Sequence, residues 1–268
     1  MVIAPKSRRK PIAANSDGSV FHFLGTGGAQ QVPAFGCECE VCQQAQRDEK
    51  KRRRACCAAI TTKNRIILID AGLPELAPYL LPYPTRHILL THYHMDHVQG
   101  LFPLRWGYGE PIPVFDPPDE TGCDDLFKHP GILHFQPPLL PFQLFELDGI
   151  RITPVPLIHS KLTYGYLIQT PMHTLAYLTD TIGLPPETAA FLSSHTLDYA
   201  IVDCSHPPQT TPPRNHNDVT RALAIFTQLN PKQLYLTHIG HELDRWLQTQ
   251  TLLPQNVHAA YDGLVLGL

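Results

Sequence analysis

The chain has 268 residues, of which 43% are hydrophobic, enough for one large domain or two small ones. Its formal net charge of −3 gives no overall electrostatic attraction to nucleic acid or to a membrane surface. No apolar stretch approaches the ~20 residues that a membrane-spanning helix requires, so we expect no membrane partner.

The beginning of the chain is rich in basic residues. Residues 1–19 lack the apolar segment of a secretory signal, and we expect a flexible extension there. A second basic run, "RDEKKRRR" at 47–54, follows. We interpret the two runs as a solvated tail and a solvated helix face.

Short apolar runs separated by turn residues predict strands along the rest of the chain, and 142–157 and 164–180 have the pattern of hairpins. Two segments, 186–195 and 217–230, are predicted helices. Because hairpins pair antiparallel, we expect an α+β fold at 20–268, with two mixed sheets packed face to face and helices outside. Further strands are expected at 20–25, 65–72, 87–92, 112–116, 199–205, 233–238 and 258–268.

The strongest chemical signal is "LLTHYHMDHVQG" at 89–100. Alternation along the strand places His92 and His94 on one face, whereas Asp96 and His97 belong to a turn and can address a second point nearby. Three imidazoles and a carboxylate suit zinc, manganese or iron. The alternative, a set of unrelated structural histidines, is disfavoured by this spacing directly after an apolar strand.

This H-x-H-x-D-H motif resembles that of the metallo-β-lactamase superfamily of metal-dependent hydrolases. The resemblance implies an αββα sandwich with a dinuclear metal site between the sheets. His94 stands where redox di-iron members carry Glu, which favours hydrolysis, and Asp70 in "LIDAG" matches a buried carboxylate that supports the ligand loop. By resemblance, one ion is held by His92, His94 and His159 and the other by Asp96, His97 and His238, with Asp180 bridging them and acting in catalysis.

Three cysteines, Cys37, Cys39 and Cys42, fall within "GCECEVC". A structural zinc ion requires four ligands, and His241, three residues after His238, is the best candidate for the fourth. The alternative is three buried thiols without metal. The total of seven cysteines is odd and three are clustered, which favours metal binding in a reducing compartment, so we expect a cytoplasmic protein.

From about residue 20 to its end, the chain resembles the phosphoribosyl cyclic phosphodiesterases (PhnP family) of the bacterial carbon–phosphorus lyase pathway. That family opens 5-phosphoribosyl 1,2-cyclic phosphate to ribose 1,5-bisphosphate in phosphonate catabolism. The resemblance implies two divalent active-site ions, manganese or else zinc, one structural zinc ion, and a small-molecule substrate; we expect a homodimer. Residues 1–19 and 43–64 depart from the family. The matching stretches are "LGTGGAQ", "GCECEVC", "LLTHYHMDHVQGLFPLRWG", "GCDDLFKHPG", "HSKLTYGYL", "DCSHPP", "PRNH" and "LTHIGH".

Two further histidines are candidates for the general acid that protonates the leaving oxygen. By resemblance the first is His216 in "PRNHND", and histidine suits proton transfer near neutral pH. His206 in "DCSHPP" is the rival, and Asp203 is a candidate to hold His206. Lys161 and Arg214 are candidates to bind the 5-phosphate, with ordinary surface charges as the alternative.

Two other functions compete with this hypothesis. A tRNA 3′-processing nuclease would use the same metal ligands, but it needs an extended basic surface. Ten of the 21 Lys and Arg residues lie before residue 55, so 55–268 carries 11 basic and 19 acidic residues, and we expect no nucleic-acid partner. The other alternative is a metal-binding scaffold without catalysis, which the complete ligand set disfavours.

Overall fold

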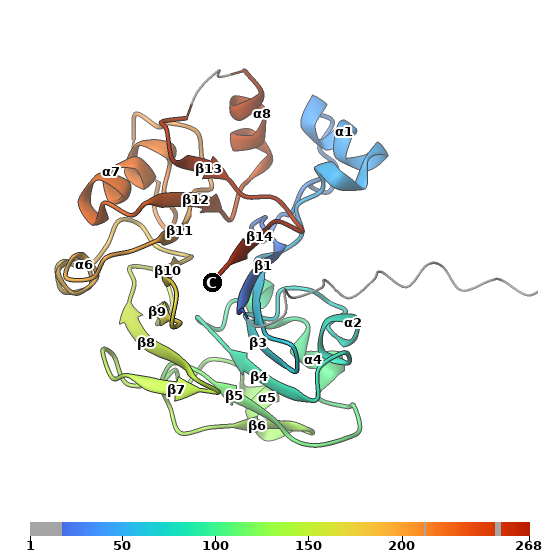
Figure 1. Ribbon diagram of the computed structural model, residues 1–268. Helices are drawn as coiled ribbons and strands as arrows, with labels where there is room; N and C mark the ends of the chain where they lie inside the picture. Colours follow the sequence, from blue (N-terminus) through green and yellow to red (C-terminus); the bar gives the residue numbers. More distant parts are fainter. Residues whose placement is uncertain (1–17, 212, 250–252) are drawn as a thin grey trace, which may run out of the picture.

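The computed structural model describes residues 18–211, 213–249 and 253–268 (Figure 1). Residues 1–17 of the extension predicted at 1–19 therefore lie outside the described residues. The fold consists of two seven-stranded sheets. In the described residues, no helix is long and apolar enough to cross a membrane.

The first sheet has the strand order β14-β1-β2-β3-β4-β5-β6. Its strands pair antiparallel from β14 to β3 and parallel from β3 to β6, so the sheet is mixed. The last strand of the chain lies beside the first, as Figure 1 shows. The strands are β1 (Val20–Gly25), β2 (Cys57–Thr61), β3 (Arg65–Ile69), β4 (Thr85–Leu89), β5 (Ile112–Phe115), β6 (Leu133–Phe135) and β14 (Val265–Gly267).

The second sheet has the order β13-β12-β11-β10-β9-β8-β7 and is also mixed. It is parallel from β13 to β10 and antiparallel from β10 to β7, which confirms both predicted hairpins. The strands are β7 (Phe145–Leu147), β8 (Ile150–Pro156), β9 (Tyr164–Gln169), β10 (Thr174–Leu178), β11 (Tyr199–Asp203), β12 (Gln233–Thr237) and β13 (Val257–Ala259).

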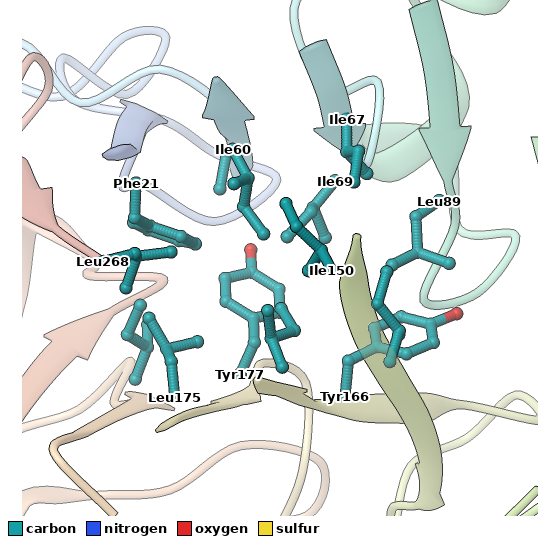
Figure 2. Close-up of a cluster of buried hydrophobic side chains, with 14 of the residues drawn as sticks. Phe21, Ile60, Ile67, Ile69, Leu89, Ile150, Tyr166, Leu175, Tyr177 and Leu268 are labelled. Carbon is teal, nitrogen blue, oxygen red and sulfur yellow. The ribbon is translucent and has the colours of Figure 1, made fainter. Parts of the chain in front are cut away.

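The core between the sheets is built by the alternate residues of both. Phe21 and Ile60 of the first sheet face Tyr166 and Tyr177 of the second, all almost fully buried (Figure 2). Because successive side chains of a strand point to opposite faces, the other residues of each strand face outward and need a second cover. Helices provide this cover.

Helices cover the outer face of each sheet. Apolar residues of α2, α4 and α5 pack on the first sheet, and those of α6, α7 and α8 pack on the second. This αββα arrangement confirms the predicted fold class. The helices are α1 (Glu40–Arg47), α2 (Ala77–Leu80), α3 (Met95–Val98), α4 (Leu101–Leu104), α5 (Asp124–Lys128), α6 (Pro186–Ser193), α7 (Val219–Leu229) and α8 (His241–Thr249), with a 3₁₀ helix at Glu49–Lys51.

The end of the chain differs from the sequence-based expectation of one strand at 258–268. The structure has β13 and β14 there, in different sheets. Asp262 interrupts the run because its carboxylate accepts hydrogen bonds from Thr26 and Arg54, and Gly263 follows with a φ of +96°. The chain therefore crosses from one sheet to the other at this turn.

The basic run at 47–54 is only partly a solvated surface. Arg53 forms two hydrogen bonds with the carboxylate of Asp244, at 2.6 and 2.8 Å, and Arg54 binds Asp262 at 3.0 Å. The side chain of Arg53 is only 11% exposed. The interpretation of this run as a solvated helix face is therefore wrong for these two arginines, which bind acidic residues from the far end of the chain.

Candidate metal centre

The predicted ligands lie at one edge of the sandwich, where several strands end. His92–His97 follow β4 of the first sheet, whereas His159, Asp180 and His238 follow β8, β10 and β12 of the second. Asp180 and His238 have left-handed backbone, with φ of 61° and 57°, and so has Asp70 after β3, with φ of 60°. Such conformations are unfavourable for residues with a Cβ and are typical of functional sites.

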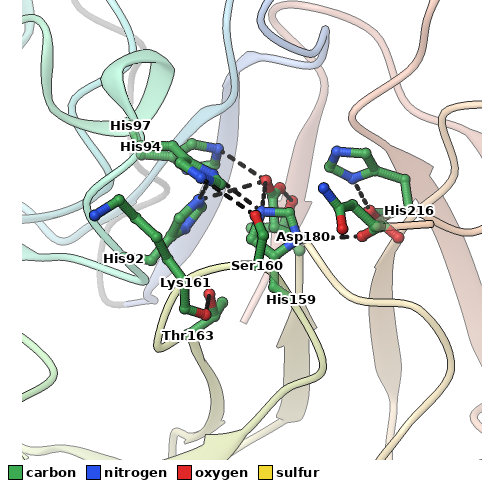
Figure 3. A network of polar contacts seen from close by, with 12 residues as sticks. His92, His94, His97, His159, Ser160, Lys161, Thr163, Asp180 and His216 are labelled. Atoms are coloured by element: carbon green, nitrogen blue, oxygen red, sulfur yellow. Dashed lines mark hydrogen bonds and ion pairs between the residues drawn. The ribbon is translucent and has the colours of Figure 1, made fainter. Parts of the chain in front are cut away.

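One group of ligand atoms comes from three histidines and Asp180 (Figure 3). His94 Nδ1 lies 2.9 Å from His92 Nε2 and 3.0 Å from His159 Nε2. Asp180 Oδ2 lies 3.6 Å from His92 Nε2 and 3.5 Å from His159 Nε2. Four donor atoms therefore converge on one point, and the structure brings together the residues proposed for the first ion.

A second group shares Asp180 with the first. His97 Nε2 lies 3.5 Å from Asp96 Oδ2 and 3.4 Å from Asp180 Oδ2. His238 Nε2 lies 3.6 Å from Asp96 Oδ2 and 3.5 Å from Asp180 Oδ1. Asp180 thus occupies the position expected of a bridging carboxylate.

Four of the five ligand imidazoles are oriented by a hydrogen bond at Nδ1, whereas His94 turns Nδ1 to the centre and has Ser160 Oγ 3.4 Å from its Nε2. Where Nδ1 carries the hydrogen and donates it outward, the lone pair of Nε2 points toward the shared centre, as a metal ligand requires. Thr91 Oγ1 can accept from His92 because its own hydroxyl donates to Asp70. The partners of Nδ1 are Thr91 Oγ1 for His92 (3.0 Å), Asp70 Oδ2 for His97 (2.8 Å), Asn215 O for His159 (3.2 Å) and Ser205 Oγ for His238 (2.9 Å).

Two buried nitrogen atoms at the centre indicate that the site fits cations. His97 Nε2 and His238 Nε2 are buried and have no hydrogen-bond partner. A buried polar atom without a partner is unfavourable, whereas the same atom aimed at a divalent ion is satisfied. The imidazole and carboxylate donors suit zinc, manganese or iron.

The histidines differ in their affinity for protons. Burial lowers the pKa of His92 well below its usual value, so its lone pair is free near neutral pH. Burial would also lower the pKa of His97, but the charges of Asp180 and Asp70 raise it well above the usual value. His97 must therefore release a proton when a cation binds, and metal affinity should rise with pH.

His216 stands beside this centre and is held by Asp203. Its Nδ1 donates to Asp203 Oδ2 over 2.7 Å, and its ring stacks on that of His238 at a centroid distance of 4.6 Å. Burial would lower the pKa of His216, but the hydrogen bond and charge of Asp203 raise it to about 8. His216 therefore carries a proton near neutral pH.

The suggestion that Asp203 holds His206 is wrong, because the Asp203 carboxylate is engaged by His216 and Asn217. His206 forms an isolated backbone bridge with Asp218 instead, and burial lowers its pKa. His206 is thus less suited than His216 to carry a proton.

The two candidate phosphate-binding residues have different surroundings. Lys161 Nζ is 3.8 Å from Asp119 Oδ2, and the charge of Lys161 contributes to lowering the pKa of His94, after the larger effect of burial. Lys161 follows Ser160, whose Oγ lies 3.4 Å from His94 Nε2, so Lys161 stands beside the metal centre (Figure 3). Arg214 is exposed, two residues before His216.

The cysteine cluster closes with His241, as expected. Cys37 Sγ and Cys39 Sγ each lie 3.4 Å from His241 Nδ1, and Cys42 completes a group whose ligand atoms are all within 4.8 Å of one another. All seven cysteines are free thiols. Three thiols and an imidazole form the donor set of a closed structural zinc site. An ion there would join the loop after β1 to the start of α8.

The glycines of "GTGG" at 25–28 have a packing function. A Cβ on Gly28 would lie 2.7 Å from Cε1 of the His238 ring, and one on Gly27 would lie 2.8 Å from the carbonyl oxygen of Arg53. Only glycine lets this loop approach the ligand His238 so closely. The loop between β1 and α1 therefore supports both metal groups.

Sequence reasoning missed the residues that orient the ligands, namely Thr91, Ser205 and Asn215. Each directly precedes a histidine in one of the motifs quoted above, namely "LTHYH", "DCSH" and "PRNH". The neighbouring histidine was the only available signal, and in two cases the partner ring lies far away in the sequence.

Several solved structures have folds similar to that of this chain. A crystal structure of a diphosphatase from the PhnP family has 27% identity and a TM-score of 0.77, and the match covers 93% of this chain and 97% of that one. Zinc-bound PqqB from Methylobacterium extorquens has 18% identity and a TM-score of 0.72, with 93% and 100% covered. The human short-form tRNase Z has 18% identity and a TM-score of 0.64, with 92% and 98% covered. The last two similarities show the fold alone.

Curated relatives are longer than this chain. An octanoyltransferase of Porphyromonas gingivalis is 29% identical over 263 residues, which cover 90% of this chain and 50% of that protein. A coenzyme PQQ synthesis protein B of Nitrosococcus oceani is 28% identical over 195 residues, covering 62% of this chain and 61% of that protein. The chain thus spans about half to three fifths of the length of these relatives.

The family model described as beta-lactamase superfamily domain matches residues 65–239. The matched segment contains β3 to β12 and every proposed active-site ligand, since it begins before Asp70 and ends just after His238. Together with the two sheets and the His/Asp groups, this match shows that the chain belongs to the beta-lactamase superfamily and has the metallo-β-lactamase fold.

Proposed function

We propose that this protein is a metal-dependent phosphodiesterase that opens 5-phosphoribosyl 1,2-cyclic phosphate to ribose 1,5-bisphosphate in phosphonate catabolism. One observation carries the proposal: the carboxylate of Asp180 lies within 3.4–3.6 Å of ligand atoms of both groups, and His216, hydrogen-bonded to Asp203, stands beside them. The likeness to a PhnP-family diphosphatase supports hydrolysis at phosphorus in general.

The ligand groups support the proposed places of the two ions. His92, His94 and His159 would hold one divalent ion, and Asp96, His97 and His238 the other, with Asp180 between them. Bound manganese or zinc ions would supply Lewis-acid chemistry, lowering the pKa of water and offsetting the negative charge of a phosphate ester. Zinc would fill the group formed by Cys37, Cys39, Cys42 and His241.

His216 supplies the proton that an alkoxide leaving group requires. Its Nδ1 hydrogen is bound to Asp203, so Nε2 is the nitrogen that can donate to the substrate. A water oxygen forms a bond to phosphorus and gives up a proton to the solvent. As the bond between phosphorus and the ribose oxygen breaks, that oxygen takes the hydrogen from Nε2, and Asp203 stabilises the orientation of the ring. Lys161, close to His94, would bind the 5-phosphate, and Arg214 is a second candidate for that contact.

A phosphoric anhydride is a second candidate substrate, because the similar PhnP-family structure is described as a diphosphatase. The leaving group of an anhydride is a phosphate, which is a weak base and needs little help from an acid. The His216–Asp203 pair is suited to a more basic leaving oxygen. The site therefore favours an ester over an anhydride.

Two other activities have less support. The similarity to tRNase Z is at 18% identity and concerns the fold, while residues 55–268 have an excess of acidic residues, which disfavours RNA. Octanoyl transfer is the activity in the name of a relative of which this chain spans half, and nothing assigns that activity to the shared half.

Phosphorus NMR of the reaction products tests the proposal. Metal-loaded protein is incubated with the cyclic ribosyl phosphate. We expect its ring-phosphate signal to be replaced by a second monoester signal, beside the 5-phosphate signal that the substrate already has. A nucleoside diphosphate derivative and a precursor tRNA are run in parallel. Faster turnover of either would replace the proposed substrate with that class.

The proposed homodimer can be tested separately. Light scattering on the purified protein should give twice the chain mass of 30.0 kDa. A mass of 30.0 kDa at micromolar concentration would contradict the homodimer.

A further inference from the structure

Asn217 is a buried polar residue that contacts three parts of the site without belonging to it. It follows His216 directly and is 0% exposed, in the turn before α7. Its side chain and backbone make hydrogen bonds to Asp203 at the end of β11, to Ser205 just after β11, and to Gly183 in the segment after β10. A buried amide whose donor and acceptor are both used constrains all the groups that it binds.

The donor side of Asn217 fixes the Asp203 carboxylate. Asn217 Nδ2 donates to Asp203 Oδ1 over 2.8 Å, and the backbone N–H of Asn217 donates to the same oxygen over 3.2 Å. With Oδ1 engaged, Oδ2 is left for the Nδ1 hydrogen of His216, at 2.7 Å. The rotation of the carboxylate, and with it the direction of the His216 ring, thus depends on the amide.

The acceptor side of Asn217 reaches the segment that carries Asp180. Asn217 Oδ1 accepts the N–H of Gly183 over 2.9 Å, three residues after Asp180, and Gly183 has a φ of +66°. The carbonyl oxygen of Asn217 accepts the N–H of Ser205, whose hydroxyl contacts His238 Nδ1. One residue therefore connects the proposed acid with the segments of two proposed metal ligands.

We propose that Asn217 is a positioning residue that sets the place of the His216 ring relative to Asp180. The inference rests on the proposed function, because it assigns to His216 the transfer of a proton to the leaving oxygen. Asparagine suits the position because one face of its amide donates and the other accepts. Aspartate would keep the acceptor toward Gly183 but would face the Asp203 carboxylate with a second negative charge.

Two variants separate these contacts. Asn217→Asp loses the donor to Asp203 and keeps an acceptor for Gly183, whereas Asn217→Ala loses both. Thr188→Ala is the matched control, because it removes a buried side-chain hydrogen bond, to the carbonyl oxygen of Pro156, on the outer face of the same sheet. Active-site metal content is measured for each variant.

Rates are compared on two diesters that differ in their leaving group. The cyclic ribosyl phosphate needs a proton donor, and bis(p-nitrophenyl) phosphate does not. We expect both Asn217 variants to slow the first substrate about 10- to 100-fold more than the second, the range for losing a hydrogen bond to a charged group. Thr188→Ala should leave the ratio of the two rates unchanged. An equal loss on both substrates, or no loss on either, would overturn the inference.

A second measurement does not depend on turnover. In the zinc-loaded protein, the Nδ1 hydrogen of His216 should give a downfield proton NMR signal, assigned by its disappearance in His216→Ala. We expect Asn217→Ala and Asn217→Asp to shift or broaden this signal, and Thr188→Ala to leave it in place. If the wild type hydrolyses neither diester, the proposed function fails, and the NMR signal alone then decides whether Asn217 positions the His216 ring. An unchanged signal in both Asn217 variants would refute the positioning role.

Discussion

His216 donates its Nδ1 hydrogen to Asp203 over 2.7 Å, and the accepting carboxylate is completely buried. An isolated carboxylate at this depth would be unfavourable, so the imidazole and Asn217 are needed to satisfy it. The same contact favours a protonated His216 beside the metal groups. The contribution of His216 to catalysis can therefore be measured by replacing it.

Replacing His216 should affect substrates according to their leaving groups. General acid catalysis is typically worth about 100- to 10,000-fold, and an alkoxide needs it whereas a nitrophenolate does not. We expect His216→Ala to slow the cyclic ribosyl phosphate by a factor in that range and bis(p-nitrophenyl) phosphate much less, with unchanged metal content. Steady-state rates on both substrates measure the difference. An equal loss would show that His216 binds phosphate or orders the site, and the acid role would pass to His206.

Asp180→Ala should behave differently from His216→Ala. The variant removes the carboxylate shared by the two ligand groups, so active-site metal content and both diester activities should fall together. Metal analysis after dialysis and rates on both substrates test this expectation. Retention of two active-site ions per chain by this variant would contradict the bridging role.

The cysteine group should hold its metal independently of the active site. Cys39→Ala removes one of four ligands, and we expect the loss of about one zinc per chain while the active-site ions remain. Elemental analysis gives the metal content, and circular dichroism first establishes that the variant is folded. If a folded variant loses all its metal, the two sites are not separate.

The substrate preference should favour diesters over monoesters. A diester brings one negative charge to the ions and leaves an oxygen near His216, whereas a monoester dianion binds differently. We expect the metal-loaded protein to hydrolyse bis(p-nitrophenyl) phosphate faster than p-nitrophenyl phosphate, as measured by nitrophenolate absorbance. Equal or faster hydrolysis of the monoester would count against a diesterase.

His22 should make the stability fall in weak acid. It is buried in β1, its Nε2 lies 2.7 Å from Thr61 Oγ1, and burial lowers its pKa to about 4. Because the unfolded chain takes up the proton near pH 6.5, this histidine destabilises the folded state progressively as the pH falls from 6.5 to 4, by about 3 kcal/mol in total. Above pH 6.5 the effect is absent.

Urea unfolding of the wild type and of His22→Gln at a series of pH values isolates this contribution. Other titrating groups, including the metal ligands, cancel in the difference between the two proteins. The difference in unfolding free energy should change by about 3 kcal/mol between pH 7 and pH 4. Parallel stability curves would show that His22 takes up its proton as readily in the folded protein as in the unfolded chain.

The fold and the ligand positions could be predicted because both follow from local patterns. Apolar runs mark the strands, and residues directly after them, such as Asp180 and His238, lie at strand ends wherever the sheets are placed. The resemblance of motifs then supplied the pairing of strand ends across the two sheets. Strands β2 and β6 were missed because β2, "CAAIT", has only one large apolar side chain and β6 has only three residues.

The remaining features depend on contacts between distant residues. The ion pair between Arg53 and Asp244 joins positions 191 residues apart, so the local run of charges indicated only a solvated surface. The partner of Asp203 was misjudged for the same reason, since nothing in the spacing distinguishes His206 from His216. The role of Asn217 requires the turns after β10 and β11 to be placed first.

The pairing of β14 with β1 sets an order of events during synthesis. Residues 20–22 pair on one side with β2 and on the other with 265–267, so that second edge of β1 can be paired only after 265–267 have left the ribosome. Until then the neighbouring edge of β1 exposes unpaired backbone groups, which attract other chains. Newly made protein should therefore depend on chaperones more than the stability of the finished fold would suggest, and fusions that hinder residues 265–267 should accumulate as aggregates.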